Sequence, residues 1–259
     1  MNGKLRFGFV LLLSILITLT ASAQRRPQSR WDGSQPASFA IRGGLTQLVG
    51  DLKDLQSTPF LGASLIVPIT STVAVEVPVD YGTLKSQQDE FYHSASSARF
   101  IQAALATSVD VLQLFRQEQR LVEVRPYVGT GLLFFRAETH DLTTGALQRL
   151  TNNQNSHRSR DGIEPRGKAG IKNTHELVWL TGIRVATALS RQMSVFGDIR
   201  FNFVRTDKLD ATLDGNNQTM SPGSLAFTEG NHYGKNTYDK WGYAAVGFNF
   251  YFGERFKKK

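Results

Sequence analysis

Apolar and polar residues alternate with a period of two along most of the chain. The clearest case runs from Val73 to Tyr81, where every second side chain is Val or Tyr and the residues between include Glu76 and Asp80. Successive side chains of a strand point to opposite faces, whereas a helix would mix the two sets on its surface. The segment therefore predicts a β-strand with one apolar face and one face of small and charged residues.

Seven more segments show the same alternation: 39–49, 60–69, 98–109, 126–136, 176–189, 194–205 and 240–252. Each has the length of about ten residues that a tilted strand needs to cross a bilayer. The pattern predicts an all-β fold, an eight-stranded antiparallel up-and-down transmembrane β-barrel. Its rival is a secreted, soluble lipocalin-like binder, in which the apolar faces would point inward.

The links between these segments alternate in length. Links 70–72 and 190–193 are short, whereas 50–59, 86–97, 137–175 and 206–239 are long and polar. In an up-and-down barrel alternate links lie at the same end, so the pattern predicts short turns at one end and long loops at the other, as in outer-membrane barrels. The link 110–125 breaks the rule, and either extends the flanking strands or packs as a small plug.

The polar faces favour the membrane barrel over the soluble one. A solvated face would be dense in charged residues, but these faces carry small residues and a few charges of both signs, which suit a narrow lumen. We expect an interior charge network, and a narrow channel for small solutes is the alternative use of the same residues. The seven residues are Arg42, Glu76, Asp80, Glu176, Arg184, Asp198 and Arg200.

Aromatic residues stand near the ends of the predicted strands. In membrane barrels such residues form girdles at the two lipid–water interfaces. We therefore expect the following side chains to face the lipid: Phe39, Tyr81, Phe100, Tyr127, Phe135, Trp179, Phe203, Trp241, Tyr251 and Phe252.

The first residues carry an export signal. Lys4 and Arg6 precede the apolar run 7–19, which ends at Ala21-Ser22-Ala23, the pattern of a cleaved signal peptide. The run is shorter than the roughly 20 residues of a spanning helix, so an uncleaved anchor is the lesser alternative. The predicted organisation is a signal peptide at 1–23, a periplasmic tail at 24–37, the barrel at 38–253 and a basic tail at 254–259.

Composition excludes several kinds of chemistry. The chain of 259 residues has no Cys, which rules out disulfides, thiolate metal sites and a cysteine nucleophile. No pair of its five His residues has the spacing of a metal site, so we expect neither a metal nor a cofactor. His93 precedes Ser94, but Asp89 and Glu90 are the only acids nearby that could orient it as a catalytic base, and ordinary loop residues are the more economical interpretation. We therefore expect no enzyme activity, with a lipid A modifying barrel enzyme as the rival.

Charge points to anionic surroundings. The net charge is +8, and +6 remains once Lys4 and Arg6 are removed with the signal peptide. Export excludes nucleic acid as a partner and leaves phosphate-rich lipid. The loop 137–175 is the strongest candidate for contacts with lipopolysaccharide phosphates, and a simply solvated loop is the alternative. Its basic residues are Arg149, Arg158, Arg160, Arg166, Lys168 and Lys172.

These features together resemble the small outer-membrane β-barrel proteins of Gram-negative bacteria, similar to OmpA and OmpX. The resemblance covers 38–253 and rests on the signal peptide, the opening strand Phe39-Ala40-Ile41-Arg42-Gly43-Gly44, the segment 126–131 and the aromatic closing strand 247–253. It implies a location in the bacterial outer membrane with both mature termini in the periplasm. It also implies recognition of the closing strand by the barrel-assembly machinery.

The family resemblance implies no single activity. We expect a structural, adhesive or assembly role carried by the long external loops, with outer-membrane lipid and lipopolysaccharide as surroundings. The segment 206–210 also resembles a loop entry found in barrels associated with gliding and type IX secretion. A secretion or cell-surface complex is therefore a further candidate partner.

Overall fold

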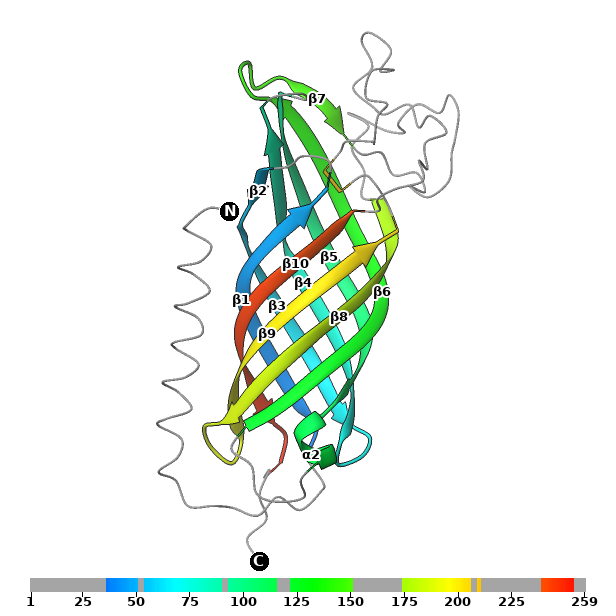
Figure 1. The fold of residues 1–259 in the computed structure, drawn as a ribbon, viewed down its shortest axis with the longest axis vertical. Helices are drawn as coiled ribbons and strands as arrows, with labels where there is room; N and C mark the ends of the chain where they lie inside the picture. The colour runs from blue at the N-terminus through cyan, green and yellow to red at the C-terminus, as the bar shows by residue number, and fades with distance from the viewer. Residues whose placement is uncertain are drawn as a thin grey trace, which may run out of the picture.

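The computed structural model describes residues 36–50, 54–89, 93–115, 122–150, 174–205, 209–210 and 239–253. Within them one sheet of ten strands closes on itself (Figure 1). The strands are β1 (Ser38–Val49), β2 (Asp54–Gln56), β3 (Thr58–Pro68), β4 (Val73–Gln88), β5 (Ser94–Val109), β6 (Val122–Asp141), β7 (Leu147–Leu150), β8 (Thr174–Ala188), β9 (Met193–Val204) and β10 (Lys240–Tyr251). The predicted signal peptide and basic tail lie outside the described residues.

Eight of the strands are the staves of a barrel: β1, β3, β4, β5, β6, β8, β9 and β10, in that order. Each pairs antiparallel with the next. The circle closes between β1 and β10, from Ser38 opposite Tyr251 to Val49 opposite Lys240. Closure leaves no strand edge unpaired, which is what a sheet needs within lipid. Short strands β2 and β7 add to the ends of β4 and β6.

The two ends of the barrel differ, as the link lengths predict. At one end, here called the short-turn end, Ile69 N donates to Val73 O over 2.9 Å and Leu189 N donates to Met193 O over 3.0 Å. The described termini of the barrel, Ser38 and Tyr251, lie at this end too. The segments 50–53, 89–93, 142–173 and 205–239 connect strands at the opposite, long-loop end.

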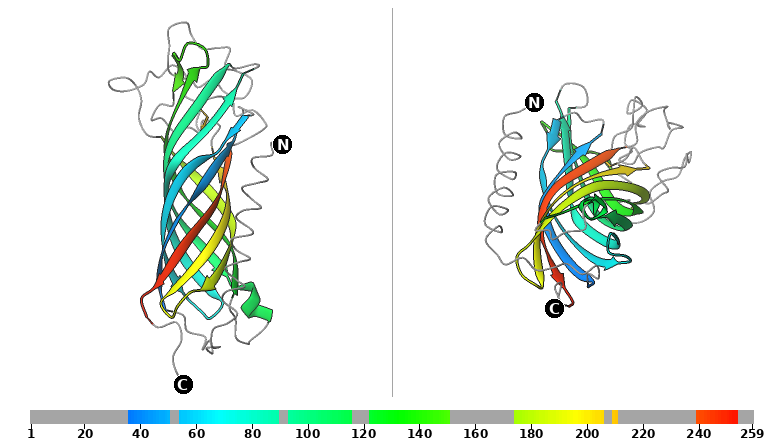
Figure 2. Two further views of the ribbon diagram at one scale, coloured as in Figure 1. Left: turned by 90° about the vertical axis from the view of Figure 1, so that its left-hand side faces the viewer. Right: turned by 60° about the horizontal axis from the view of Figure 1, so that its bottom comes forward.

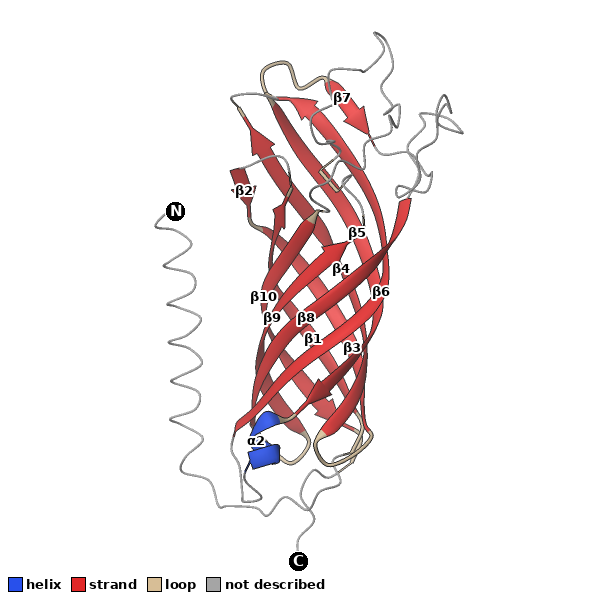
Figure 3. Ribbon diagram, turned by 45° about the vertical axis from the view of Figure 1, so that its right-hand side comes forward, coloured by secondary structure: helices blue, strands red, loops and turns tan. Residues whose placement is uncertain are grey.

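The link 110–125 contains α2 (Val111–Phe115), which lies at the short-turn end (Figure 3). Asp110 caps this helix, because its Oδ1 accepts hydrogen bonds from Leu112 N and Gln113 N. Leu112 and Leu114 are exposed, so they do not plug the lumen. The remainder from Val122 extends β6, which confirms the first alternative in part. No described helix is long and apolar enough to cross a membrane.

Three of the four predicted long loops contain strand residues. Loop 50–59 includes β2 and the start of β3, and loop 137–175 includes the end of β6, all of β7 and the start of β8. The largest error is the loop 86–97. The segment 86–97 continues β4 and β5, and only 89–93 links them. The alternation persists there with Ser in place of larger residues: Ser86, Ser94 and Ser96 are buried on the inner side. As a result β4, β5 and β6 extend beyond β1 and β10 at the long-loop end (Figure 2).

The outer face of the barrel is apolar. Its inner face is polar or charged in the half next to the short-turn end. Leu61, Val128 and Phe201 are 69%, 63% and 58% exposed on the outer face, whereas the charged residues Arg42, Asp80 and others lie inside. A soluble lipocalin-like barrel requires the reverse arrangement, because its apolar residues would have to leave water. The structure therefore confirms the transmembrane barrel and places an apolar belt around it.

Half of the aromatic residues predicted to face the lipid lie inside instead. Phe39, Tyr81, Trp179, Phe203 and Phe252 are exposed on the outer face, as predicted. Phe100, Tyr127, Phe135, Trp241 and Tyr251 are buried in the lumen. Their parity along the strands shows why, since each stands one residue out of phase with the outward row, as Tyr251 does between Phe250 and Phe252.

An apolar layer fills the part of the lumen next to the long-loop end. Phe60 packs on Tyr243 with ring centroids 4.4 Å apart, and Phe100 packs on Trp241 at 4.6 Å. Leu209, from the segment 205–239, is fully buried in the same cluster. The buried side chains of this cluster thus occupy the lumen at this level.

Candidate functional site

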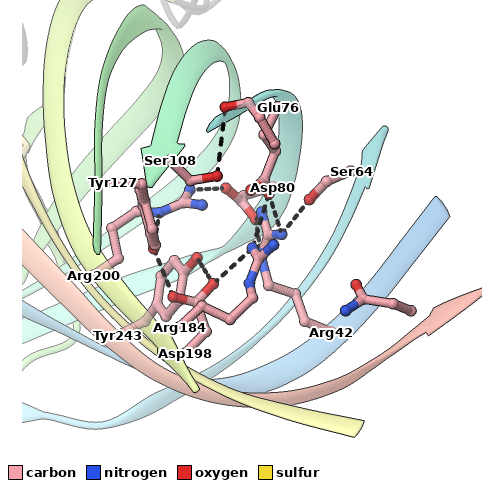
Figure 4. Close-up of polar contacts among 12 residues, drawn as sticks. Arg42, Ser64, Glu76, Asp80, Ser108, Tyr127, Arg184, Asp198, Arg200 and Tyr243 are labelled. Carbon is pink, nitrogen blue, oxygen red and sulfur yellow. Dashed lines mark hydrogen bonds and ion pairs between the residues drawn. The ribbon is translucent and has the colours of Figure 1, made fainter. Parts of the chain in front are cut away.

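The interior charge network lies in the lumen beneath the apolar layer. Six of the seven predicted residues meet there from four strands: Arg42 on β1, Glu76 and Asp80 on β4, Arg184 on β8, and Asp198 and Arg200 on β9 (Figure 4). Each is at most 4% exposed. Three guanidinium groups face three carboxylates, so the network is neutral as a whole.

Asp80 joins two of the arginines. Its Oδ1 lies 2.6 Å from Arg42 Nη2 and also accepts from Arg42 Nε at 3.1 Å. Its other oxygen, Oδ2, lies 2.7 Å from Arg200 Nη1. Charge-assisted bonds of this length are the strong class of hydrogen bond. Asp80 therefore ties β1 to β9 from its position on β4.

Asp198 is held by two tyrosines and one arginine. Tyr127 donates from its hydroxyl to Oδ1 over 2.6 Å, and Tyr243 donates to Oδ2 over 3.1 Å. Arg184 Nη2 lies 3.2 Å from the same Oδ2. Tyr127 also accepts from Arg200 Nε at 3.0 Å, which makes it a bridge between the two groups.

Glu76 completes the ring of contacts. Its Oε1 lies 2.9 Å from Arg184 Nη2 and 3.5 Å from Arg42 Nη1. The guanidinium of Arg184 also stacks over Phe196 at 4.6 Å from the ring centroid. A cation over an aromatic face gains electrostatic energy where water is excluded. The network thus combines ion pairs, tyrosine hydroxyls and aromatic faces into one connected layer.

Such a layer stabilises the barrel only while it is complete. Burying a charge is costly unless its partner is in place, and removal of one partner from a buried pair costs about 3–5 kcal/mol. Each carboxylate here contacts at least two donors, so each deletion removes contacts from more than one neighbouring group. This connectivity is typical of a structural core. All three carboxylates are engaged by donors, so none of them is free to guide a solute.

Glu176 stands apart from the other six. It is buried in the lumen, but it lies on β8 eight positions from Arg184 and opposite Leu133 of the apolar layer. Strands rise about 3.3 Å per residue, which puts some 26 Å between the two positions along the strand. The structure therefore places Glu176 near the long-loop end and outside the network.

Sequence reasoning missed the tyrosines of the network and a second ion pair. Tyr127 was assigned to the lipid interface, yet its parity with Arg125 and Glu123 on β6 would have placed it inside. Near the short-turn end, Arg125 Nε lies 3.0 Å from Glu123 Oε2, and Arg125 Nη2 lies 3.9 Å from Asp110 Oδ2. The glycines Gly129 and Gly131 hide the phase of this strand in the sequence.

A small cavity lies between the network and the short-turn end. Arg184 and Glu76 line it from the network, and Arg125, Asn249 and Tyr251 line it from below. Its volume is about 20 Å³, which is roughly the space that one water molecule needs. The cavity can hold ordered solvent, but it is too small to bind a metabolite.

The residues considered for catalysis do not assemble into a site. His93 Nε2 lies 2.7 Å from Thr143 Oγ1, and its Nδ1 lies 2.9 Å from Asp89 Oδ1. Ser94 is fully buried on the inner face, whereas His93 is exposed, so the two side chains point apart. Among the described residues no group of three His, Asp or Glu side chains has the arrangement of a metal site.

Most of the basic loop residues predicted to contact lipopolysaccharide lie outside the described residues: Arg158, Arg160, Arg166, Lys168 and Lys172. Arg149 of β7 is described only by its backbone, which pairs with that of Thr139 in β6. Asp141 is the last residue of β6, and its side chain accepts hydrogen bonds in the turn that follows. The backbone N–H and hydroxyl of Thr144 donate to its carboxylate and lower the pKa of Asp141.

Comparisons with known proteins concern the fold alone. No protein-family model and no curated protein matches the sequence. Among solved structures, the chain is similar to Ail, the attachment invasion locus protein of Yersinia pestis, at 9% identity over 85% of this chain and 99% of that one, with a TM-score of 0.46. Neisserial surface protein A matches at 14% identity over 85% and 98%, with a TM-score of 0.42. OprG from Pseudomonas aeruginosa matches at 11% identity over 85% and 98%, with a TM-score of 0.41.

Proposed function

We propose that this protein is an integral outer-membrane barrel that does not conduct and that acts through its long-loop end outside the cell. The observation that carries the proposal is the inversion of the barrel, with large apolar side chains exposed outside and a neutral charge network buried inside. Only lipid around the belt removes that apolar surface from water without a partner protein. In Gram-negative bacteria the outer membrane is the membrane that holds such barrels.

The filled lumen supports a closed barrel over a channel. A solute would have to pass the aromatic layer around Trp241 and Phe100 and then break the contacts of Asp80 with Arg42 and Arg200. Eight strands enclose a space that their own side chains fill. The interior residues therefore hold the staves together, and interactions with other molecules are left to the loops and the outer surface.

The long-loop end is the candidate interaction surface. Strands β4, β5 and β6 carry it beyond the rest of the barrel, and the basic loop 137–175 follows from β6 and β7. The proposed roles are structural, adhesive or in assembly of a surface complex, with lipopolysaccharide among the contacts of the loop. The closing strand β10 is the proposed signal for the barrel-assembly machinery, because its aromatic row Phe248, Phe250 and Phe252 faces outward.

Four measurements test this proposal: heat-dependent gel mobility, recovery from the extracted outer membrane, conductance in planar bilayers and the mass of lipid A in cells. Folded barrels resist detergent at room temperature, so we expect a shift of mobility on heating in gel electrophoresis and recovery from the detergent-extracted outer membrane. In planar bilayers we expect no conductance steps. Recovery as a water-soluble monomer would contradict the membrane location, steady conductance would contradict the closed lumen, and altered lipid A mass in cells that express the protein would favour the enzyme.

A further inference from the structure

Basic residues stand directly above the apolar belt at the long-loop end. On five of the eight staves, one Lys or Arg continues the outward row just past its apolar residues. These residues are Lys85 on β4, Arg99 on β5, Arg136 on β6, Arg205 after β9 and Lys240 on β10, and all are exposed. We call this set the basic collar.

The position of the collar relative to the belt is fixed by the strand period. Arg99 stands two residues from Ile101, Arg136 two residues from Phe134, and Arg205 two residues from Phe203. Residues two apart on a strand share a face, and these apolar neighbours are exposed on the outer side. The collar therefore lies outside the barrel where the hydrocarbon region of the surrounding lipid ends.

Two arginines of the collar face each other directly. Arg99 pairs with Arg136 in the register of β5 and β6, and Lys85 lies diagonal to Arg99, which is opposite Thr83. Like charges directly opposite on adjacent strands destabilise a sheet unless something neutralises them. The nearby Glu138 pairs with Arg136 at 2.7 Å. Among the described residues, neither Lys85 nor Arg99 forms an ion pair.

Within the part of the chain that the structure describes, the collar lies at the long-loop end alone. Among the described residues, the exposed Lys and Arg side chains are the five of the collar and Arg191 in the 189–192 turn. The outer leaflet of an outer membrane carries phosphorylated glycolipid, and the inner leaflet carries ordinary phospholipid. An asymmetric ring of positive charge matches that asymmetry when the long-loop end faces outward.

We propose that Lys85, Arg99 and Arg136 form a binding site for the phosphates of lipid A, whose acyl chains lie on the belt formed by residues such as Tyr81, Ile101 and Phe134. The proposal rests on the outer-membrane location proposed above. Guanidinium groups bind phosphate through two parallel N–H donors. Arg99 presents such a pair, and Arg136, whose Nε and Nη2 donate to Glu138, keeps Nη1 as a further donor. The headgroup of lipid A is a disaccharide with two phosphates, so one molecule can neutralise collar residues on neighbouring strands. A single phospholipid headgroup offers one phosphate.

The test uses the mature full-length protein folded in phosphatidylcholine vesicles. The vesicles contain bisphosphorylated lipid A, the same lipid A after removal of its phosphates, or phosphatidylglycerol at equal phosphate content. Lipid A binding is followed by native mass spectrometry, and heat-dependent gel mobility reports insertion. The variant is Arg99→Gln/Arg136→Gln. Its controls are Arg99→Lys/Arg136→Lys, which keeps the charge, and Arg191→Gln, which removes a charge at the opposite end.

We expect the wild type to prefer phosphorylated lipid A and the Gln variant to lose about tenfold or more in affinity. The Lys variant should keep part of the affinity and Arg191→Gln should keep all of it. Equal binding by the Gln variant, or equal binding of phosphatidylglycerol, overturns the site. If the Gln variant does not insert, Lys85→Gln replaces it, with a smaller loss expected. Failure of the wild type to insert overturns the membrane proposal as well, so the two failures are distinct.

Discussion

Asp80 and Arg200 form an ion pair of 2.7 Å across the lumen, although 120 positions separate them in the chain. The same carboxylate holds Arg42 through its other oxygen. The pair therefore fixes the register of strands that are not neighbours in the barrel. Because both side chains are fully buried, their interaction is shielded from the screening that weakens exposed pairs.

Removal of Asp80 tests the energy of this layer. We expect Asp80→Ala to lower the free energy of unfolding by about 3–5 kcal/mol, because it leaves buried Arg200 without a carboxylate in contact and leaves Arg42 only the longer contact with Glu76. Urea unfolding in lipid vesicles measures the change. The matched control is Glu138→Ala, which removes a partly exposed ion pair with Arg136 and should cost less than about 1 kcal/mol. Equal losses in the two variants would contradict a special role for the interior network.

The face assignment predicts an effect of depth. Val77 lies within the apolar belt on β4 and is 44% exposed, so Val77→Arg should destabilise the folded barrel in lipid by about 2–4 kcal/mol. Gln47→Arg, on β1 near the long-loop end and opposite Gly242, should cost about 0–1 kcal/mol. Refolding titrations in vesicles compare the two variants. A harmless Val77→Arg would mean that this row does not meet hydrocarbon.

Tyr127 is predicted to matter for its hydroxyl group. Tyr127→Phe removes the donor to Asp198 and the acceptor for Arg200, and we expect a loss of about 1–3 kcal/mol from the polar atoms left unpaired. Tyr81→Phe is the control, because Tyr81 is exposed on the outer face. Urea unfolding of both variants should separate them, and equal stability of the two would show that the hydroxyl of Tyr127 contributes nothing.

The turn after β6 should respond to acid. Hydrogen bonds from Thr144 and Thr143 lower the pKa of Asp141 below its ordinary value of 3.8. Their stabilisation is therefore complete above the ordinary pKa and is lost as the pH falls through the lowered native value. We expect the amide proton signals of both threonines in NMR spectra to titrate with a midpoint below 3.8. A midpoint at or above that value, or an unchanged titration in Asp141→Asn, would contradict the assignment.

The barrel was predictable because its information is local. Two-residue periodicity identifies each strand from its own residues, as in the segment from Val73 to Tyr81. The alternation of short and long links then indicates at which end of the barrel each connection lies. The grouping of Arg42, Asp80 and Arg200 was also expected, because all three stand on polar faces. Glu176 shows the limit, since parity places a side chain inside but does not give its height in the lumen.

Other features depend on register, which the sequence does not state. Trp241 and Phe100 look like interfacial aromatics because they stand near strand ends, although their parity with the polar rows places them inside. The contacts of Tyr127 with Asp198 and Arg200 join strands far apart in the chain, so no local pattern marks them. The collar is similar: Arg99 and Arg136 are ordinary polar residues in the sequence, and only the register of β5 and β6 sets them opposite each other.

The most direct test of the account uses the two tryptophans that lie on opposite sides of the wall. Trp179 is 58% exposed on the outer face, and Trp241 is 1% exposed in the lumen. With Trp31 and one of these two replaced by Phe, each protein is folded in vesicles with brominated acyl chains and its fluorescence is recorded. We predict strong quenching of Trp179 and little of Trp241. Quenching of Trp241 with Trp179 unaffected would contradict the claim that the apolar rows face lipid.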